Sequence, residues 1–280
     1  MRVWKKGFLG GVIALSWSLP CFAGLDVYAG PLGKFYKKDY LSTQAQIAKE
    51  LGAEFKTVYP DGEPDWLTDK NAQKKIRAFR ESLAKETKDN SPDMANWTED
   101  TNEYLIEQLN WDCLSALIHI TAHTIRQDIK RPKEFSGDYE DYPAYIESDD
   151  KGYYLGPLAI LESDLYLPSN GQSFLFHETP LKDEVLITTT ANLKRTLEFL
   201  NKAQWKGKAR PDEWFTRGPV TDGISQEIKV SPVTGKSEIV EVEHPPVDDI
   251  ALHNAEYAYG VLHKLLSYAQ KHNVPIAMDG

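Results

Sequence analysis

Two histidines four residues apart are the clearest candidates for chemistry in this sequence. His119 and His123 lie in residues 111–129, where apolar residues recur at the spacing of an amphipathic helix. Because residues i and i+4 share one face of a helix, the two imidazoles can approach one metal ion, and imidazole is a common zinc ligand. The spacing therefore makes His119 and His123 candidate zinc ligands. The alternative is a polar helix face turned to solvent.

A catalytic zinc site needs three protein ligands, and the sequence specifies two. Zinc proteases place Glu directly after the first histidine of such a pair, but Ile120 stands there. His253, Glu256 or His263 in the last expected helix could supply a third ligand only if that helix lies against residues 111–129. Apart from this zinc, the sequence predicts no cofactor.

Other patterns of enzyme chemistry are weaker. Ser82-Leu83-Ala84-Lys85 matches the Ser-x-x-Lys pattern of penicillin-recognising enzymes, but its companion motifs Ser-Asp-Asn and Lys-Thr-Gly are absent. Sugar hydrolysis needs two carboxylates at a set separation, and 42 acidic residues leave any particular pair arbitrary. Tryptophans stack on sugars or fill cores, and five follow residue 23: Trp66, Trp97, Trp111, Trp205 and Trp214.

Residues 138–154 are the best candidate for a recognition surface. Five tyrosines lie there among six acidic residues. Tyrosine gives a large contact area at a small entropic cost, and carboxylates select a basic partner. The alternative is an ordinary loop whose tyrosines pack onto the body. The candidate partner-binding residues are Tyr139, Tyr142, Tyr145, Tyr153 and Tyr154.

The elements that must position these residues follow from hydrophobic spacing and from capping and breaking residues. We expect helices over residues 40–52, 69–85, 100–109, 111–129, 191–202 and 248–272. We expect strands over residues 25–30, 54–59, 158–161, 173–177 and 185–190, and a β-hairpin of residues 224–230 and 237–243. Helices dominate and strands do not alternate with them regularly, which predicts a mainly helical single α+β domain with short strands.

The first 23 residues have the order of a secretory signal peptide. Three basic residues precede an apolar run over residues 7–17, and a proline and small residues follow. The run is short for a spanning helix, which needs roughly 20 apolar residues. Cys-Phe-Ala at 21–23 suits cleavage after Ala23, whereas Pro20 disfavours lipid attachment at Cys21. We therefore expect a leader over 1–23, a soluble domain over 24–280, and a location in the periplasm or outside the cell.

The charge balance narrows the choice of partners. The chain carries 32 basic and 42 acidic residues, and removal of a leader with three cations and no acid takes the net charge from −10 to −13. Such acidity argues against nucleic acid and against anionic membrane surfaces. It is compatible with a basic protein partner. Cys113 would be the one cysteine left, so we expect no internal disulfide and a buried, inert thiol.

The start of the expected mature chain resembles a group of uncharacterised bacterial proteins. That group opens with Gly-Leu-Asp-Val-Tyr, then Gly, Leu and a pair of tyrosines. Residues 24–36 read Gly-Leu-Asp-Val-Tyr-Ala-Gly-Pro-Leu-Gly-Lys-Phe-Tyr, and Trp111-Asp112-Cys113 is similar to a second patch of the group. The resemblance implies a shared fold and no known activity, and it supports Gly24 as the first residue of the domain.

Export, acidity and the lack of a catalytic signature together favour a protein-binding function. We expect an inhibitor or immunity-like factor that binds a basic toxin or hydrolase. An exported hydrolase, metal-dependent through His119 and His123, is the alternative, and a structural component of the cell envelope is a third.

Overall fold

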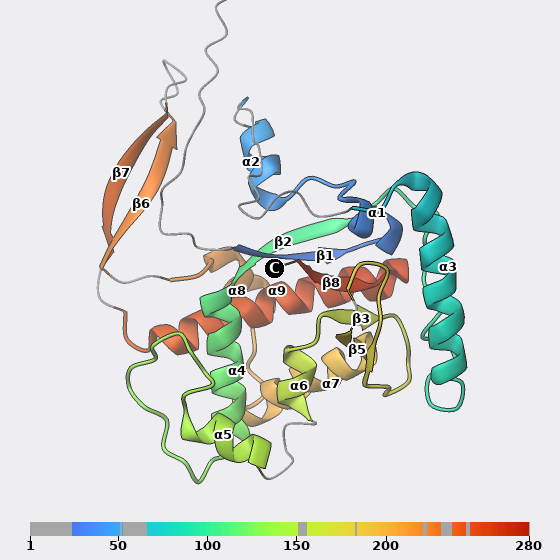
Figure 1. Ribbon diagram of the computed structural model, residues 1–280. Helices are drawn as coiled ribbons and strands as arrows, with labels where there is room; N and C mark the ends of the chain where they lie inside the picture. Colours follow the sequence, from blue (N-terminus) through green and yellow to red (C-terminus); the bar gives the residue numbers. More distant parts are fainter. Residues whose placement is uncertain are drawn as a thin grey trace, which may run out of the picture.

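A mixed sheet of six strands, in the order β2-β1-β8-β3-β5-β4, organises the computed structural model of this chain (Figure 1). The structure describes residues 24–50, 52, 66–150, 156–182, 184–220, 223–230, 237–244 and 247–279. Within the sheet, β3 and β5 run parallel and every other neighbouring pair runs antiparallel. The six strands are β1 (Gly24–Ala29), β2 (Leu105–Asn110), β3 (Leu165–Leu167), β4 (Leu175–His177), β5 (Val185–Thr189) and β8 (Ile276–Asp279).

The described helices cover both faces of this sheet. On one face lie α4 (Trp111–Ile125), α6 (Pro157–Leu161), α7 (Thr190–Ala203), α8 (Pro211–Arg217) and α9 (Ile250–His272). On the other face lie α1 (Leu32–Lys37) and α3 (Asp69–Glu86). Two further helices, α2 (Thr43–Glu50) and α5 (Pro143–Asp150), lie near opposite ends of the view in Figure 1.

The alternation of residues along β1 explains why there are two cores. Successive side chains of a strand point to opposite faces. Leu25 and Val27 therefore join the core beneath α4 and α9, whereas Asp26 and Tyr28 face the side of α1. On β8, Ala277 packs in the second core, which α1 and α3 cover.

Several helices begin where the sequence supplies a capping side chain. The Asn110 side chain accepts a hydrogen bond from the backbone N–H of Cys113 at 2.7 Å, and Thr189 accepts one from Asn192 at 3.2 Å. Each bond satisfies one of the free N–H groups in a first helical turn. Thr68 precedes α3, but its side chain makes no capping hydrogen bond.

The fold class predicted from the sequence is confirmed, since helices pack around a mixed sheet in an α+β arrangement. The expected hairpin is present as β6 (Gly223–Val230) and β7 (Ser237–His244), which pair antiparallel. Cys113 is fully buried, as expected, and burial raises the pKa of its thiol to about 12. Within the described residues, no helix combines the length and apolar character needed to cross a membrane.

Two predicted elements are wrong. Residues 100–109 were expected to form a helix, but Leu105–Asn110 form β2, because their backbone completes the sheet beside β1. Residues 158–161 were expected to form a strand, but they lie in α6, where Pro157 occupies the first turn and presets a helical φ.

Other boundaries shifted or were missed. Two short helices were not predicted: α1, which follows β1, and α5, which lies within the tyrosine-rich segment. The helix expected over 111–129 ends at Ile125. The strand expected over 54–59 lies outside the described residues, as does the expected leader.

Candidate functional site

The two predicted zinc ligands lie together, with His119 buried and His123 half-buried. Helix α4 places the rings of His119 and His123 with their centroids 4.7 Å apart. His119 is only 1% exposed, because Phe135 stacks on it at 4.6 Å and Tyr142 contacts its edge at 4.6 Å. The alternative of a solvent-facing stripe is therefore wrong for His119.

Each histidine keeps one buried nitrogen without a hydrogen-bond partner among the described residues. These are Nδ1 of His119 and Nε2 of His123, whose own Nδ1 donates to the carbonyl of Ile129 at 3.1 Å. Burial lowers the pKa of both histidines, that of His119 to about 4, so the rings are neutral at pH 7. Neutral imidazole is the form that binds a metal.

Of the three residues proposed as the third zinc ligand, two make other contacts, whereas Nδ1 of His253 is buried and has no hydrogen-bond partner among the described residues. Helix α9 does pack against α4. However, Glu256 pairs instead with Arg217 at 2.9 Å, and His263 stacks on Tyr259. Among the described residues, no group of three or more His, Cys, Asp or Glu side chains is arranged to hold a metal ion.

The predicted tyrosines of the recognition segment turn toward the body. The rings of Tyr139 and Tyr145 meet edge to face at 4.9 Å, and both pack against the larger core. Tyr145 also donates a hydrogen bond to Glu162 at 2.8 Å, and the Tyr142 hydroxyl accepts one from the backbone N–H of Ser136 at 2.9 Å. Tyr153 and Tyr154 lie outside the described residues.

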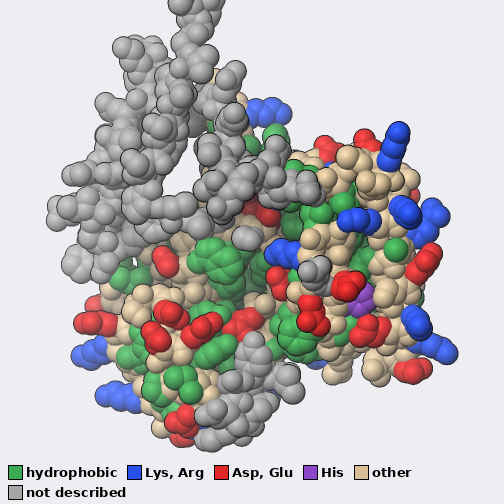
Figure 2. Space-filling model, viewed as in Figure 1, with side chains coloured by type: hydrophobic (Ala, Val, Ile, Leu, Met, Phe, Trp, Pro, Cys, Tyr) green, Lys and Arg blue, Asp and Glu red, His purple; other side chains and the backbone are tan. Residues whose placement is uncertain are grey.

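Four carboxylates in and just before this segment are exposed to solvent. Residues 134–150 contain seven acidic residues and no lysine or arginine. In Figure 2, acidic and hydrophobic side chains lie side by side over the lower left of the molecule, where α4 and α5 lie. Ile146 on α5 is 46% exposed among them. The exposed acidic residues described here are Glu134, Asp138, Glu140 and Asp141.

A buried cation holds this acidic segment in place. Arg126, after the end of α4, is 4% exposed and donates to Glu147 at 2.8 Å and to both carboxylate oxygens of Asp128. These carboxylates raise the pKa of Arg126 above its usual range. Together with the tyrosine contacts, the ion pairs fix the backbone from which the outward carboxylates project.

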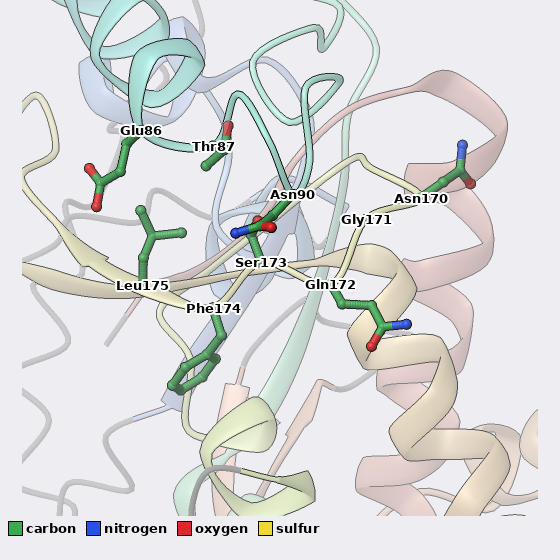
Figure 3. Close-up of a pocket in the computed structure, with 9 residues that line it drawn as sticks. All are labelled: Glu86, Thr87, Asn90, Asn170, Gly171, Gln172, Ser173, Phe174 and Leu175. Atoms are coloured by element: carbon green, nitrogen blue, oxygen red, sulfur yellow. The ribbon is translucent and has the colours of Figure 1, made fainter.

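One hollow in the described part of the chain lies at the end of α3 and measures about 710 Å³ (Figure 3). Glu86, Thr87 and Asn90 form one side, and residues 170–175 form the other. Beside it, Ser82 Oγ lies 3.0 Å from Nε2 of His177. Ser82 is inside a helix whose backbone N–H groups are already bonded, so the pair has no donors from its own turn for an oxyanion.

A second hollow, about 350 Å³, is a candidate site that sequence reasoning missed. It lies against β8 and β3, and aromatic rings of Phe35, Tyr36 and Trp66 line it with Lys38 and Asp279. Lys38 donates to Asp279 Oδ2 and, at 2.7 Å, to the Tyr40 hydroxyl. Tyr40 donates to the same oxygen of Asp279.

Behind this hollow, two carboxylates face each other across neighbouring strands. Asp26 on β1 is directly opposite Asp279 on β8, which places their Cβ atoms about 5 Å apart. Asp26 is 6% exposed, and its Oδ1 finds no hydrogen-bond partner among the described residues. Burial raises the pKa of Asp26 to about 6, Asp279 adds to the rise, and Thr43 and Lys38 partly offset it.

One signal in the sequence pointed to Asp26. The alternation predicted for residues 25–30 puts Asp26 on a strand. The structure places that strand inside the sheet, where a charged residue is costly unless it is paired. Asp279 carried no such signal, because β8 is four residues long and was not predicted. Only strand pairing brings the two carboxylates together.

Comparisons of this chain with protein-family models, with curated proteins and with solved structures each found no match. The candidate sites are therefore judged on their own geometry.

Proposed function

We propose that this is an exported protein that binds a basic protein partner, as an inhibitor or immunity-like factor. The observation that carries the proposal is the acidic segment 134–150, with seven carboxylates and no cation, held rigid by tyrosine and arginine contacts. A surface of one sign accelerates encounter with a partner of the other sign. The expected leader and the net charge of −10 support the same function.

Preorganisation is what separates this segment from an ordinary solvated loop. Ordering a flexible loop on binding costs conformational entropy, and a loop that is already fixed avoids that cost. Here Tyr139, Tyr142 and Tyr145 fix the backbone, and Ile146 supplies exposed apolar area among the carboxylates. We therefore expect the carboxylates and Ile146 to make the contact.

The test is affinity capture from the source cell's periplasmic extract, followed by binding measurements with the recovered partner. Neutralising Glu134, Asp138, Glu140 and Asp141 to the matching amides should weaken binding at least about tenfold and flatten its salt dependence. A control that neutralises four exposed acids elsewhere removes the same charge: Glu81, Asp89, Glu198 and Asp212. Equal loss in both variants, or an acidic partner, would sink the proposal.

A zinc-dependent hydrolase is the second candidate. The observation that favours it is the pair of buried, unpartnered nitrogens on His119 and His123, on rings 4.7 Å apart. Elemental analysis of protein purified without chelator tests it. About one zinc per chain that disappears in His119→Ala would support the candidate, and protein free of zinc after incubation with the metal would end it.

A further inference from the structure

We propose that the hollow lined by Phe35, Trp66 and Asp279 binds a small amine with an apolar body. The walls suit both parts of such a ligand. Leu165, Val185 and Ala277 offer apolar surface, and the aromatic rings and Asp279 offer the environment of a cation. This inference is independent of the acidic segment, which lies on α5 and the loop before it.

A cation already bound at this place shows how an ammonium group is held. The Nζ of Lys38 lies 5.6 Å from the ring centroid of Phe35, 5.2 Å from that of Tyr40 and 4.9 Å from that of Trp66. A cation within about 6 Å of an aromatic face is attracted by the ring quadrupole. Asp279 completes the arrangement as the counter-ion.

Hydrogen-bonding capacity remains for a second donor. Within the described residues, the hydrogen bonds from Lys38 and Tyr40 both end on Oδ2 of Asp279, which leaves Oδ1 for a ligand. This open position is an acceptor, so it favours a ligand that donates and disfavours one that only accepts.

The local charge balance also favours a cationic ligand. Around the hollow and the strand pair behind it, the described carboxylates are Asp26, Asp164 and Asp279, and the ammonium groups are Lys38 and Lys182. Lys182 lies 3.9 Å from Asp164 and its side chain is 60% exposed, so it does little to neutralise Asp26 and Asp279. A ligand cation beside Asp279 would supply the missing charge.

Proton release should accompany binding. Because the pKa of Asp26 is raised to about 6, roughly half of this carboxyl is protonated at pH 6. Asp279, Lys38 and Thr43 are the groups that set this value besides burial. A cation bound at Asp279 favours the charged form of Asp26, so up to about half a proton should leave per ligand.

The probes share one body and differ in the charge of the head group: phenethylamine, 2-phenylethanol and phenylacetate. Calorimetry at pH 6, in buffers of different ionisation enthalpy, gives affinity and proton release together. We expect the amine to bind at least about tenfold more tightly than the alcohol, and the carboxylate least. Preference for phenylacetate, or no binding of any probe, would overturn the proposal.

Variants of the carboxylates and of Lys38 test where the amine binds, and they distinguish a loss of binding from a loss of folding. Asp279→Asn should abolish the preference for the amine, whereas Asp26→Asn should keep the preference and lose the proton release. Lys38→Met removes the resident cation and should tighten amine binding several-fold, a gain that a misfolded protein cannot show. Asp164→Asn is the matched control, and loss of the preference there instead of in Asp279→Asn would refute the assignment to Asp279.

Discussion

Replacing Asp26 with asparagine should make this protein more stable at neutral pH. Burial raises the pKa of Asp26 from its usual 3.8 to about 6. Each pKa unit corresponds to about 1.4 kcal/mol, so holding the carboxylate charged at pH 7 costs the folded state about 3 kcal/mol. Asparagine has nearly the same shape and carries no charge to desolvate.

The sign of the pH dependence follows from the direction of this shift. Between pH 3.8 and 6 the folded protein binds more protons than the unfolded chain, so the contribution of Asp26 to stability falls as pH rises through that window. The advantage of Asp26→Asn should therefore be small near pH 4. It should grow to about 2–3 kcal/mol at pH 7 and change little above it.

Urea denaturation followed by tryptophan fluorescence, between pH 4 and 7.5, measures this difference. Asp279→Asn is the control, because it weakens an acceptor that serves both Lys38 and Tyr40 and should destabilise the protein at pH 7. If Asp26→Asn is no more stable than the parent at pH 7, or if its gain is the same at every pH, the carboxyl is not strained by burial. A buried residue that lowers the stability of the fold is better explained by a function than by packing.

Two further changes test the packing around the histidine pair and α9. His119→Leu should make the fold less sensitive to acid. Burial lowers the pKa of His119 to about 4, so the contribution of the neutral ring to the free energy of unfolding is complete above pH 6.5. About 2–3 kcal/mol of that contribution is lost as the pH falls toward 4. Denaturation curves at pH 7 and pH 4.5 give the comparison, and a parent and variant that lose equal stability on acidification would contradict it. Gly260→Ala should destabilise by about 1–3 kcal/mol, because a Cβ there would lie 2.7 Å from the carbonyl oxygen of Pro211 and 2.9 Å from the backbone nitrogen of Phe215. Thermal unfolding checks this, and an unchanged midpoint would mean that α8 can shift away from α9.

The long amphipathic helices were predictable because their signal is local. The apolar spacing of α3, α7 and α9 and the breaking residues around them lie within the elements themselves. The hairpin of β6 and β7 was predictable for the same reason, since its strands flank one short connection. The class of the fold followed from these elements.

The sheet was less predictable because its pairings are distant in the sequence. Strand β1 lies between β2 and β8, whose residues are about 80 and 250 positions away. No window of local sequence contains those partners. A short segment such as Leu105–Asn110 therefore reads as a helix until the edge it completes is known.

The features of the candidate sites were likewise either local and predictable from the sequence, or set only by tertiary contacts. The sequence by itself determined that His119 and His123 share a helix face and that residues 138–154 are rich in tyrosine and acidic residues, because both facts depend on neighbours along the chain. Only the tertiary structure decided that His119 is buried and that the segment's tyrosines point inward. It alone placed Asp26 opposite Asp279, since the pairing of β1 with β8 joins the two ends of the described chain and brings a second carboxylate beside the buried Asp26.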